Sequence, residues 1–150
     1  MSSLKNRIND DIKAAMKGGQ KARLATLRMI SAAIKQREVD ERIELTDDQV
    51  VAVLDKMCKQ RRESIAQFDK AGRDDLSNTE KQELEIIQTF MPAALSDEEI
   101  DALVRAAIEK TGASDIKGMG KVMGILKPEL QGRADMSVVS TKVRGLLGNA

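Results

Sequence analysis

Lysine and glycine residues gather near residue 120 of the chain. The run Gly118-Met119-Gly120-Lys121 opens a stretch of helical periodicity, and Lys117 precedes it. The first turn of a helix leaves backbone N–H groups without partners inside the helix, and these groups favour an anion. Lysines on both sides of the glycines add positive charge. These residue types in this order are therefore what a phosphate-binding site needs.

Further basic residues follow along the chain. We expect Lys127-Pro128 to end the helix, and the turn Gly132-Arg133-Ala134-Asp135 leads into a last helix that carries Lys142. An arginine on this turn could reach a neighbouring phosphate. The candidate RNA- or phosphate-binding residues are Lys117, Gly118, Gly120, Lys121, Lys127, Arg133 and Lys142. The alternative interpretation is that the glycines only permit close helix packing and that the lysines are solvated.

The residues available for catalysis are few. The chain has no His, no Tyr and a single Cys, so the usual proton shuttle, the usual zinc ligand and a Cys–His nucleophile pair are absent. Its carboxylate clusters stand at expected helix starts, where acidic side chains complement the helix dipole. We therefore assign no catalytic residue, no metal ligand and no cofactor, and we interpret Cys58 as a packed thiol.

The composition favours an all-α protein. Of the 150 residues 41% are hydrophobic, yet Phe68 and Phe90 are the only aromatic ones. A core of Leu, Ile, Val, Met and Ala is typical of a helical bundle. Apolar residues recur at helical spacing in four segments, which lie at 4–16, 24–39, 50–72 and from 74 or 77 to 91. The start of the fourth helix stays open, because Asp74 and Ser77 are both suitable N-caps.

A domain boundary is expected at Pro92. The capping box from Ser96 to Glu99 begins a new helix, and shorter helical patterns follow up to Gly112, over 118–127 and through Val139 to Leu147. We predict an N-terminal bundle of about four helices over residues 1–92 and a smaller three-helix domain over residues 96–150. Three short helices make only a small core, so the second domain should be the less stable one.

Several of these segments resemble the GatB/YqeY family, whose stand-alone YqeY-like members have this size. The landmarks are Thr26-Leu27-Arg28-Met29-Ile30, Gln60-Arg61-Arg62-Glu63-Ser64-Ile65, Phe90-Met91-Pro92, Met119-Gly120-Lys121-Val122-Met123 and Gly132-Arg133-Ala134-Asp135. The last two resemble the C-terminal tail domain of the transfer RNA amidotransferase B subunit. In that subunit, the tail contacts the body of transfer RNA.

The resemblance implies a role connected with transfer RNA or with glutamine-dependent transamidation. Its family-level label is carbon–nitrogen ligase activity with glutamine as amido-N-donor. Because the catalytic residues are missing, we expect a transfer RNA-binding or accessory module that is not catalytic alone, with transfer RNA and a translation-related or amidotransferase protein as partners. The alternatives are a free-standing amidotransferase, which the missing residues disfavour, and a protein–protein adaptor without RNA contact.

Basic residues also occur in the N-terminal half. The formal net charge is only +1, so the chain is not a strongly basic nucleic-acid module. Lys21, Arg28 and Lys35 nevertheless follow one another at heptad spacing on one side of the second predicted helix. We predict a secondary basic surface formed by Arg28, Lys35, Arg61, Arg62 and Arg73. The alternative is a solvated helix face, which charged stripes usually are.

The sequence also gives an expectation for location. No apolar run reaches the roughly 20 residues that a membrane span requires. Charged residues, among them Lys5, Arg7 and Asp10, stand where a secretory signal would have its apolar region. We therefore expect a cytoplasmic monomer without membrane contact.

Overall fold

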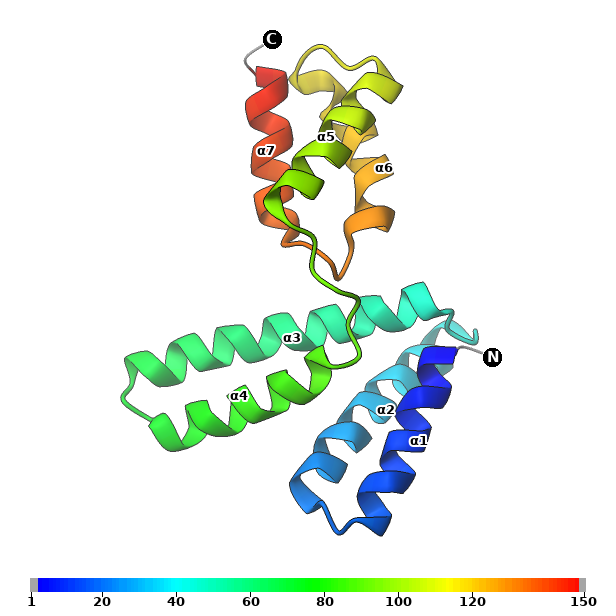
Figure 1. Cartoon of the computed structure of the whole chain (residues 1–150), viewed down its shortest axis with the longest axis vertical. Helices are drawn as coiled ribbons and strands as arrows, with labels where there is room; N and C mark the ends of the chain where they lie inside the picture. Colours follow the sequence, from blue (N-terminus) through cyan, green and yellow to red (C-terminus); the bar gives the residue numbers. More distant parts are fainter. Residues whose placement is uncertain (1–2, 149–150) are drawn as a thin grey trace. The chain divides into compact units, whose positions relative to one another are not determined.

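The computed structural model describes residues 3–148, and this part of the chain is helical without a β-strand. The predicted all-α class is confirmed (Figure 1). The elements are α1 (Ser3–Lys17), α2 (Lys21–Glu41), α3 (Asp47–Lys70), α4 (Asp74–Gln88), α5 (Asp97–Thr111), the 3₁₀ turn η1 (Ile116–Gly118), α6 (Met119–Leu130) and α7 (Met136–Gly148). They form two compact units, Met1–Met91 and Pro92–Ala150.

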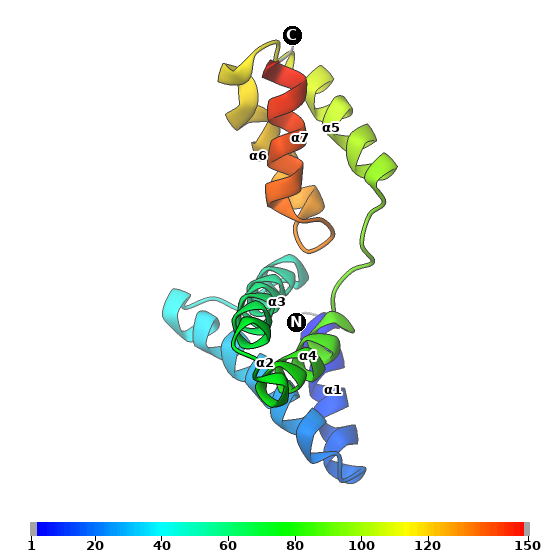
Figure 2. The same ribbon diagram turned by 90° about the vertical axis from the view of Figure 1, so that its left-hand side faces the viewer.

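The first unit consists of two helical hairpins. Helices α1 and α2 run antiparallel, α3 and α4 do the same, and the two hairpins cross each other (Figures 1 and 2). The crossing buries Leu27 and Ile30 of α2 against Leu54 of α3 and Ile87 of α4, all fully excluded from solvent. The residues that were spaced at helical intervals in the sequence therefore form one shared apolar core.

A sequence-encoded cap fixes the start of α3, whereas α4 begins without a side-chain cap. Thr46 and Gln49 form a reciprocal capping box at the start of α3. Helix α4 begins at Asp74, so Asp74 rather than Ser77 marks its start. Ser77 is buried inside α4, where its hydroxyl donates a hydrogen bond to Asp69 of α3. That contact across the hairpin explains why Ser77 does not cap the helix.

The second unit packs α5, α6 and α7 around their own core. Ser96 and Glu99 form the predicted capping box at the start of α5. Val104 of α5, Val122 and Leu126 of α6, and Val139 of α7 are fully buried against one another. The helices have 12 to 15 residues, compared with 21 and 24 residues for α2 and α3 of the first unit.

The end of α6 differs from the prediction. Pro128 does not stop the helix, which continues to Leu130. Leu130 is fully buried in the core of the second unit, and its carbonyl accepts hydrogen bonds from the amides of Arg133 and Ala134. Burial of this leucine and the closed turn after it outweigh the one hydrogen bond that a proline cannot donate.

Candidate nucleic-acid interface

One side of α6 and of the turn before it is exposed and carries lysines and glycines, most of them predicted for the site. Lys117, Gly120, Lys121, Gly124 and Lys127 are all exposed, whereas Val122, Leu126 and Leu130 point into the core. We call these five exposed residues the α6 face. None of the three lysines forms an ion pair within residues 3–148. The α6 face thus presents three uncompensated positive charges beside exposed helix backbone.

Contrary to the prediction, the backbone amides at the start of α6 are already hydrogen-bonded within the chain and are not free to bind an anion. Asp115 caps η1, and its carboxylate accepts a hydrogen bond of 3.0 Å from the amide of Lys117. The amide of Gly118 donates to the carbonyl of Asp115, and that of Met119 donates to the carbonyl of Ile116. The expectation of unpaired N–H groups at this helix start is therefore wrong. A carboxylate of the chain already occupies the position that an anion would take.

Gly118 has a packing role. A Cβ atom at this position would lie 2.5 Å from the Cβ of Ala113, a distance that side chains do not tolerate. By contrast, a Cβ atom at Gly120 or Gly124 would meet no heavy atom within 4 Å. The alternative interpretation, that glycine permits close packing, thus holds for Gly118 and not for Gly120. Gly124, which the sequence analysis did not assign, lies one turn beyond Gly120.

The two other predicted residues of the second unit already have partners. Arg133 is half-buried, its Nε donates to the carbonyl of Ala93 at 3.3 Å, and its own carbonyl accepts from the amide of Leu95 at 2.9 Å. The ammonium of Lys142 lies 2.8 Å from a carboxylate oxygen of Asp101 on α5. That hydrogen bond to Asp101 raises the pKa of Lys142.

The predicted secondary basic surface is only partly a surface. Arg28, Lys35 and Arg62 are exposed. Arg61 is buried, and its Nε lies 3.4 Å from a carboxylate oxygen of Glu83 on α4. Arg73 is exposed but binds Asp75, and this hydrogen bond lowers the pKa of Asp75. Arg61 therefore belongs to the α3–α4 packing, because it follows Met57 and Cys58 on the buried side of α3.

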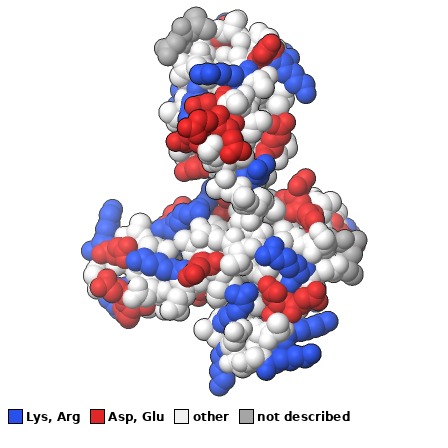
Figure 3. Space-filling model, viewed as in Figure 1, with Lys and Arg blue, Asp and Glu red and all other residues white. Residues whose placement is uncertain are grey.

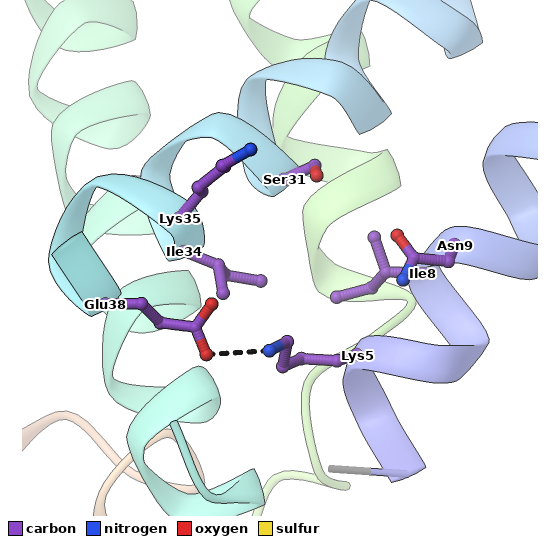
Figure 4. Close-up of a pocket in the computed structure, with 7 residues that line it drawn as sticks. All are labelled: Lys5, Ile8, Asn9, Ser31, Ile34, Lys35 and Glu38. Carbon is purple, nitrogen blue, oxygen red and sulfur yellow. Dashed lines mark hydrogen bonds and ion pairs between the residues drawn. The ribbon is translucent and has the colours of Figure 1, made fainter. Parts of the chain in front are cut away.

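A small cavity of about 160 Å³ lies between α1 and α2 (Figure 4). It is lined by Lys5, Ile8, Asn9, Ser31, Ile34, Lys35 and Glu38. Lys5 and Glu38 form an ion pair of 2.6 Å across it, and the amide of Leu45 also donates to Glu38. These bonds, first the one from Lys5, lower the pKa of Glu38. Sequence reasoning missed this pair. Lys5 and Glu38 lie on different helices, and no pattern in the nearby sequence shows that these two helix faces meet.

Both charge signs are mixed over each unit in the view of Figure 3, with acidic side chains gathered at the start of α5. Within the described chain, no three His, Cys, Asp or Glu side chains gather in a way that could hold a metal ion. None of the described helices is long and apolar enough to cross a bilayer. Cys58 is buried, and burial raises the pKa of its thiol.

Comparison with known proteins decides the family. The family model described as "Yqey-like protein" matches residues 5–147, which span both units. The chain belongs to the YqeY-like protein family. The resemblance that the sequence landmarks indicated is thereby confirmed for the YqeY-like proteins. The match includes the α6 face and both crossed hairpins.

Named relatives of this YqeY-like chain come from fungi. Altered inheritance of mitochondria protein 41, mitochondrial, from Pyrenophora tritici-repentis is 32% identical over 146 residues, which cover 95% of this chain and 80% of the relative. The proteins of the same name from Eremothecium gossypii and Kluyveromyces lactis are 36% and 38% identical. These two alignments cover 69% and 65% of this chain but only 58% and 54% of the relatives.

The names of these relatives correct one expectation. They are mitochondrial proteins by name, which contradicts the cytoplasmic location predicted from the sequence. The prediction rested on charged residues in place of an apolar secretory signal. Mitochondrial transit peptides have no such apolar region, so that argument does not separate the two compartments.

Proposed function

We propose that this YqeY-like chain is an accessory module that binds folded RNA, such as transfer RNA, and does not catalyse transamidation alone. The observation that carries the proposal is the α6 face, where three exposed lysines that form no ion pair within residues 3–148 flank two exposed glycines. A phosphate backbone is the anionic surface that such an arrangement suits.

The glycines of the α6 face support a close approach by a ligand. Glycine in a helix interior costs about 1 kcal/mol relative to alanine. Packing inside the described chain gives no reason for that cost at Gly120 and Gly124, since a Cβ atom there would lie in open space. An RNA backbone lying against α6 would explain why glycine is present, because a side chain at either position would keep the RNA from approaching the helix.

The proposed contacts position an RNA without reading its bases. Lys117, Lys121 and Lys127 would neutralise phosphates, while the chain has only two aromatic residues on which an unpaired base could stack. Gly118 and Arg133 would contribute by shaping the loops around α6. Lys142 would take part only if its pair with Asp101 opens. Recognition would therefore follow the shape of a folded RNA.

The non-catalytic part of the proposal rests on the residue inventory. The chain lacks His and Tyr, and its one thiol is buried with a raised pKa. A nucleophile of the Cys–His type is therefore not available to release ammonia from glutamine. We propose that any link to a carbon–nitrogen ligase activity requires a partner protein.

Fluorescence anisotropy with labelled, folded transfer RNA tests the RNA contact. The logarithm of the affinity should fall linearly with the logarithm of salt concentration, by about 0.9 per duplex phosphate contact and about 0.7 per single-strand contact. Lys121→Glu and Lys127→Glu should each weaken binding at all salt concentrations and reduce this slope by about 1. Arg105→Glu is the matched control, since Arg105 is an exposed basic residue of the same unit that lies on α5 and not on the α6 face.

Three results would contradict the proposal. Equal affinity and slope for wild type, Lys121→Glu and Lys127→Glu would exclude the α6 face. A folded protein with no measurable affinity for RNA at low salt would favour the adaptor without RNA contact. Ammonia release from glutamine that follows the protein through purification would overturn the non-catalytic part.

A further inference from the structure

Helix α2 has two apolar faces. Its inward face carries Leu27, Ile30 and Ile34, which are buried in the core of the first unit. Its outward face carries residues at alternating spacings of three and four, namely Ala22, Ala25, Met29, Ala32, Gln36 and Val39, and all six are exposed. We call these six residues the α2 seam.

The α2 seam is not what a solvated helix face presents. A surface helix normally has a single apolar stripe toward the core and polar residues opposite. Here Met29 is 41% exposed and Val39 is 63% exposed, on the side that faces away from the bundle. Alternating spacings of three and four over five turns are the pattern of a seam that packs against another helix.

A row of basic residues borders the seam on the side of α1. The row consists of Lys21, Arg28 and Lys35, each of which directly precedes a seam residue. They are seven residues apart, so they line up along one border of the seam, as the residues flanking a heptad seam do. All three are exposed, and none forms an ion pair within residues 3–148. We call them the α2 ridge. The Nη2 of Arg28 lies 3.7 Å from the Sδ of Met16 on α1, and Lys35 lines the cavity between α1 and α2.

The opposite border of the seam turns into the bundle. Thr26 is buried and Ala33 is half-buried, so neither can face a partner. Asp40, the next residue along this border, accepts a hydrogen bond from Gln36 of the seam. A partner would therefore meet apolar seam residues on one side and the positive charges of the α2 ridge on the other.

We propose that the α2 seam docks an amphipathic helix of another protein, whose own apolar seam is bordered by acidic residues. The alanines would let the two helices approach closely, and Met29 would adapt to the partner's side chains. The acidic border would pair with the α2 ridge and set the direction of the partner helix. This interaction goes beyond the proposed RNA binding, because it uses another unit and another class of partner.

Charge complementarity disfavours a second copy of the chain as the occupant. In an antiparallel pair of α2 helices, the α2 ridge of one copy would lie against that of the other, and like charges would repel. In a parallel pair, each ridge would face the border with Thr26 and Ala33, which is turned into the bundle. RNA is a poorer occupant as well, since phosphates could use the ridge but would leave the apolar seam without a partner.

A pair of synthetic peptides provides the test. Each spans three heptads with leucine and alanine at its seam, and the bordering positions hold glutamate in one peptide and lysine in its twin. The full chain should bind the glutamate peptide in fluorescence anisotropy, and salt should weaken the complex. The double variant Arg28→Glu, Lys35→Glu should lose about tenfold in affinity for the glutamate peptide and should bind the lysine twin instead.

Further variants separate the seam from general charge effects. Met29→Asp should weaken binding of the glutamate peptide by about tenfold or more, since it places a charge in the middle of the apolar contact. Lys56→Glu is the matched charge control, because Lys56 is exposed on α3 and should leave peptide binding unchanged. Circular dichroism and a thermal melt of each variant show that it remains folded.

Several results would overturn the proposal. Absence of binding to either peptide, or equal binding to both, would remove the charge-complementary docking face. Self-association in sedimentation that Met29→Asp abolishes would assign the seam to a second copy. If the wild type binds neither peptide and the Arg28→Glu, Lys35→Glu variant loses affinity for RNA, the ridge would be assigned to RNA. Lys121→Glu should not change peptide binding, so failure of this inference and failure of the proposed RNA binding are distinguishable.

Discussion

Two glycines that stand two positions apart serve different purposes. Gly118 is a glycine because Ala113 leaves no room for a Cβ atom, whereas Gly120 lies in open space on the α6 face. In both cases the backbone has ordinary negative φ values, so conformation does not demand glycine. Only the surroundings distinguish a packing glycine from one that is open to a ligand.

Substitution by alanine should separate these roles. Gly118→Ala should destabilise the second unit by roughly 1–3 kcal/mol, because the added methyl group would force the loop at Ala113 to move. Gly124→Ala should stabilise the same unit by up to about 1 kcal/mol through its higher helix propensity. Urea unfolding followed by circular dichroism measures both changes.

The partner residue supplies the control for the steric argument. Ala113→Gly combined with Gly118→Ala should recover part of the lost stability, since the two methyl groups would no longer collide. A Gly118→Ala protein as stable as the wild type would show that the loop adjusts at no cost. It would also remove the packing explanation for this glycine.

Sequence reasoning succeeds unevenly at the residue scale. It selects Lys121 and Lys127 as exposed basic residues, because their helical spacing from Val122 and Leu126 places them opposite the core. It fails for Arg61. Arginine is usually a surface residue, but Arg61 is buried beside Glu83. The charge that compensates Arg61 lies on another helix, and no local pattern reveals that pairing.

At the scale of elements, caps are more predictable than helix ends. Thr46 and Ser96 cap their helices through residues three positions away, so the sequence contains the whole interaction. The end of α6 depends instead on burial of Leu130 among residues of α5 and α7. For this reason a proline that normally ends a helix is tolerated in its last turn.

One ion pair links α1 to α2 and to the loop after α2. Glu38 accepts hydrogen bonds from the ammonium of Lys5 and from the amide of Leu45, whose side chain is buried in the core. These bonds lower the pKa of Glu38 below its ordinary value. Protonation of Glu38 would therefore weaken the attachment of both α1 and the loop to α2 (Figure 4).

The direction of the pKa shift gives a prediction for pH. Since the pKa of Glu38 is lower in the folded chain than in the unfolded chain, its contribution to stability is present above about pH 4.3, the ordinary glutamate value. That contribution should be lost as the pH falls through the lowered pKa. Glu38→Gln should reduce stability at neutral pH and flatten the acidic part of the pH dependence of the first unit.

Denaturant titrations at a series of pH values measure this effect. Asp10→Asn is a suitable control, because Asp10 is exposed on α1 and forms no ion pair within the described residues. The explanation fails if wild type and Glu38→Gln lose stability in parallel over the acidic range. In that case other carboxylates would determine the acid sensitivity of the first unit.

For the whole molecule, each unit has a core of its own. The apolar cluster of α1 to α4 and that of α5 to α7 are separate sets of residues. The sequence predicts a boundary between residues 92 and 96, because Pro92 and the capping box at Ser96 are local signals. It says nothing of how the crossed hairpins of the first unit meet, since that depends on contacts between residues far apart in the chain.

Separate cores predict separate unfolding. The second unit has helices of only 12 to 15 residues, and Gly120, Gly124 and Gly145 lie inside them at a cost of up to about 1 kcal/mol each. We therefore expect amide protons of residues 92–148 to exchange at lower protection than those of the core helices α2 and α3. Hydrogen exchange followed by mass spectrometry on the full chain measures this difference.

Core variants determine whether the two units are independent. Ile87→Ala removes a fully buried side chain from the first unit and should cost that unit about 2–5 kcal/mol, while the exchange of residues 92–148 stays as in the wild type. Gly124→Ala should slow exchange only in the second unit. A change in both units from either substitution, together with a single cooperative opening, would mean that the chain unfolds as one body. The separate cores would then be coupled through contacts that outweigh the difference in their size.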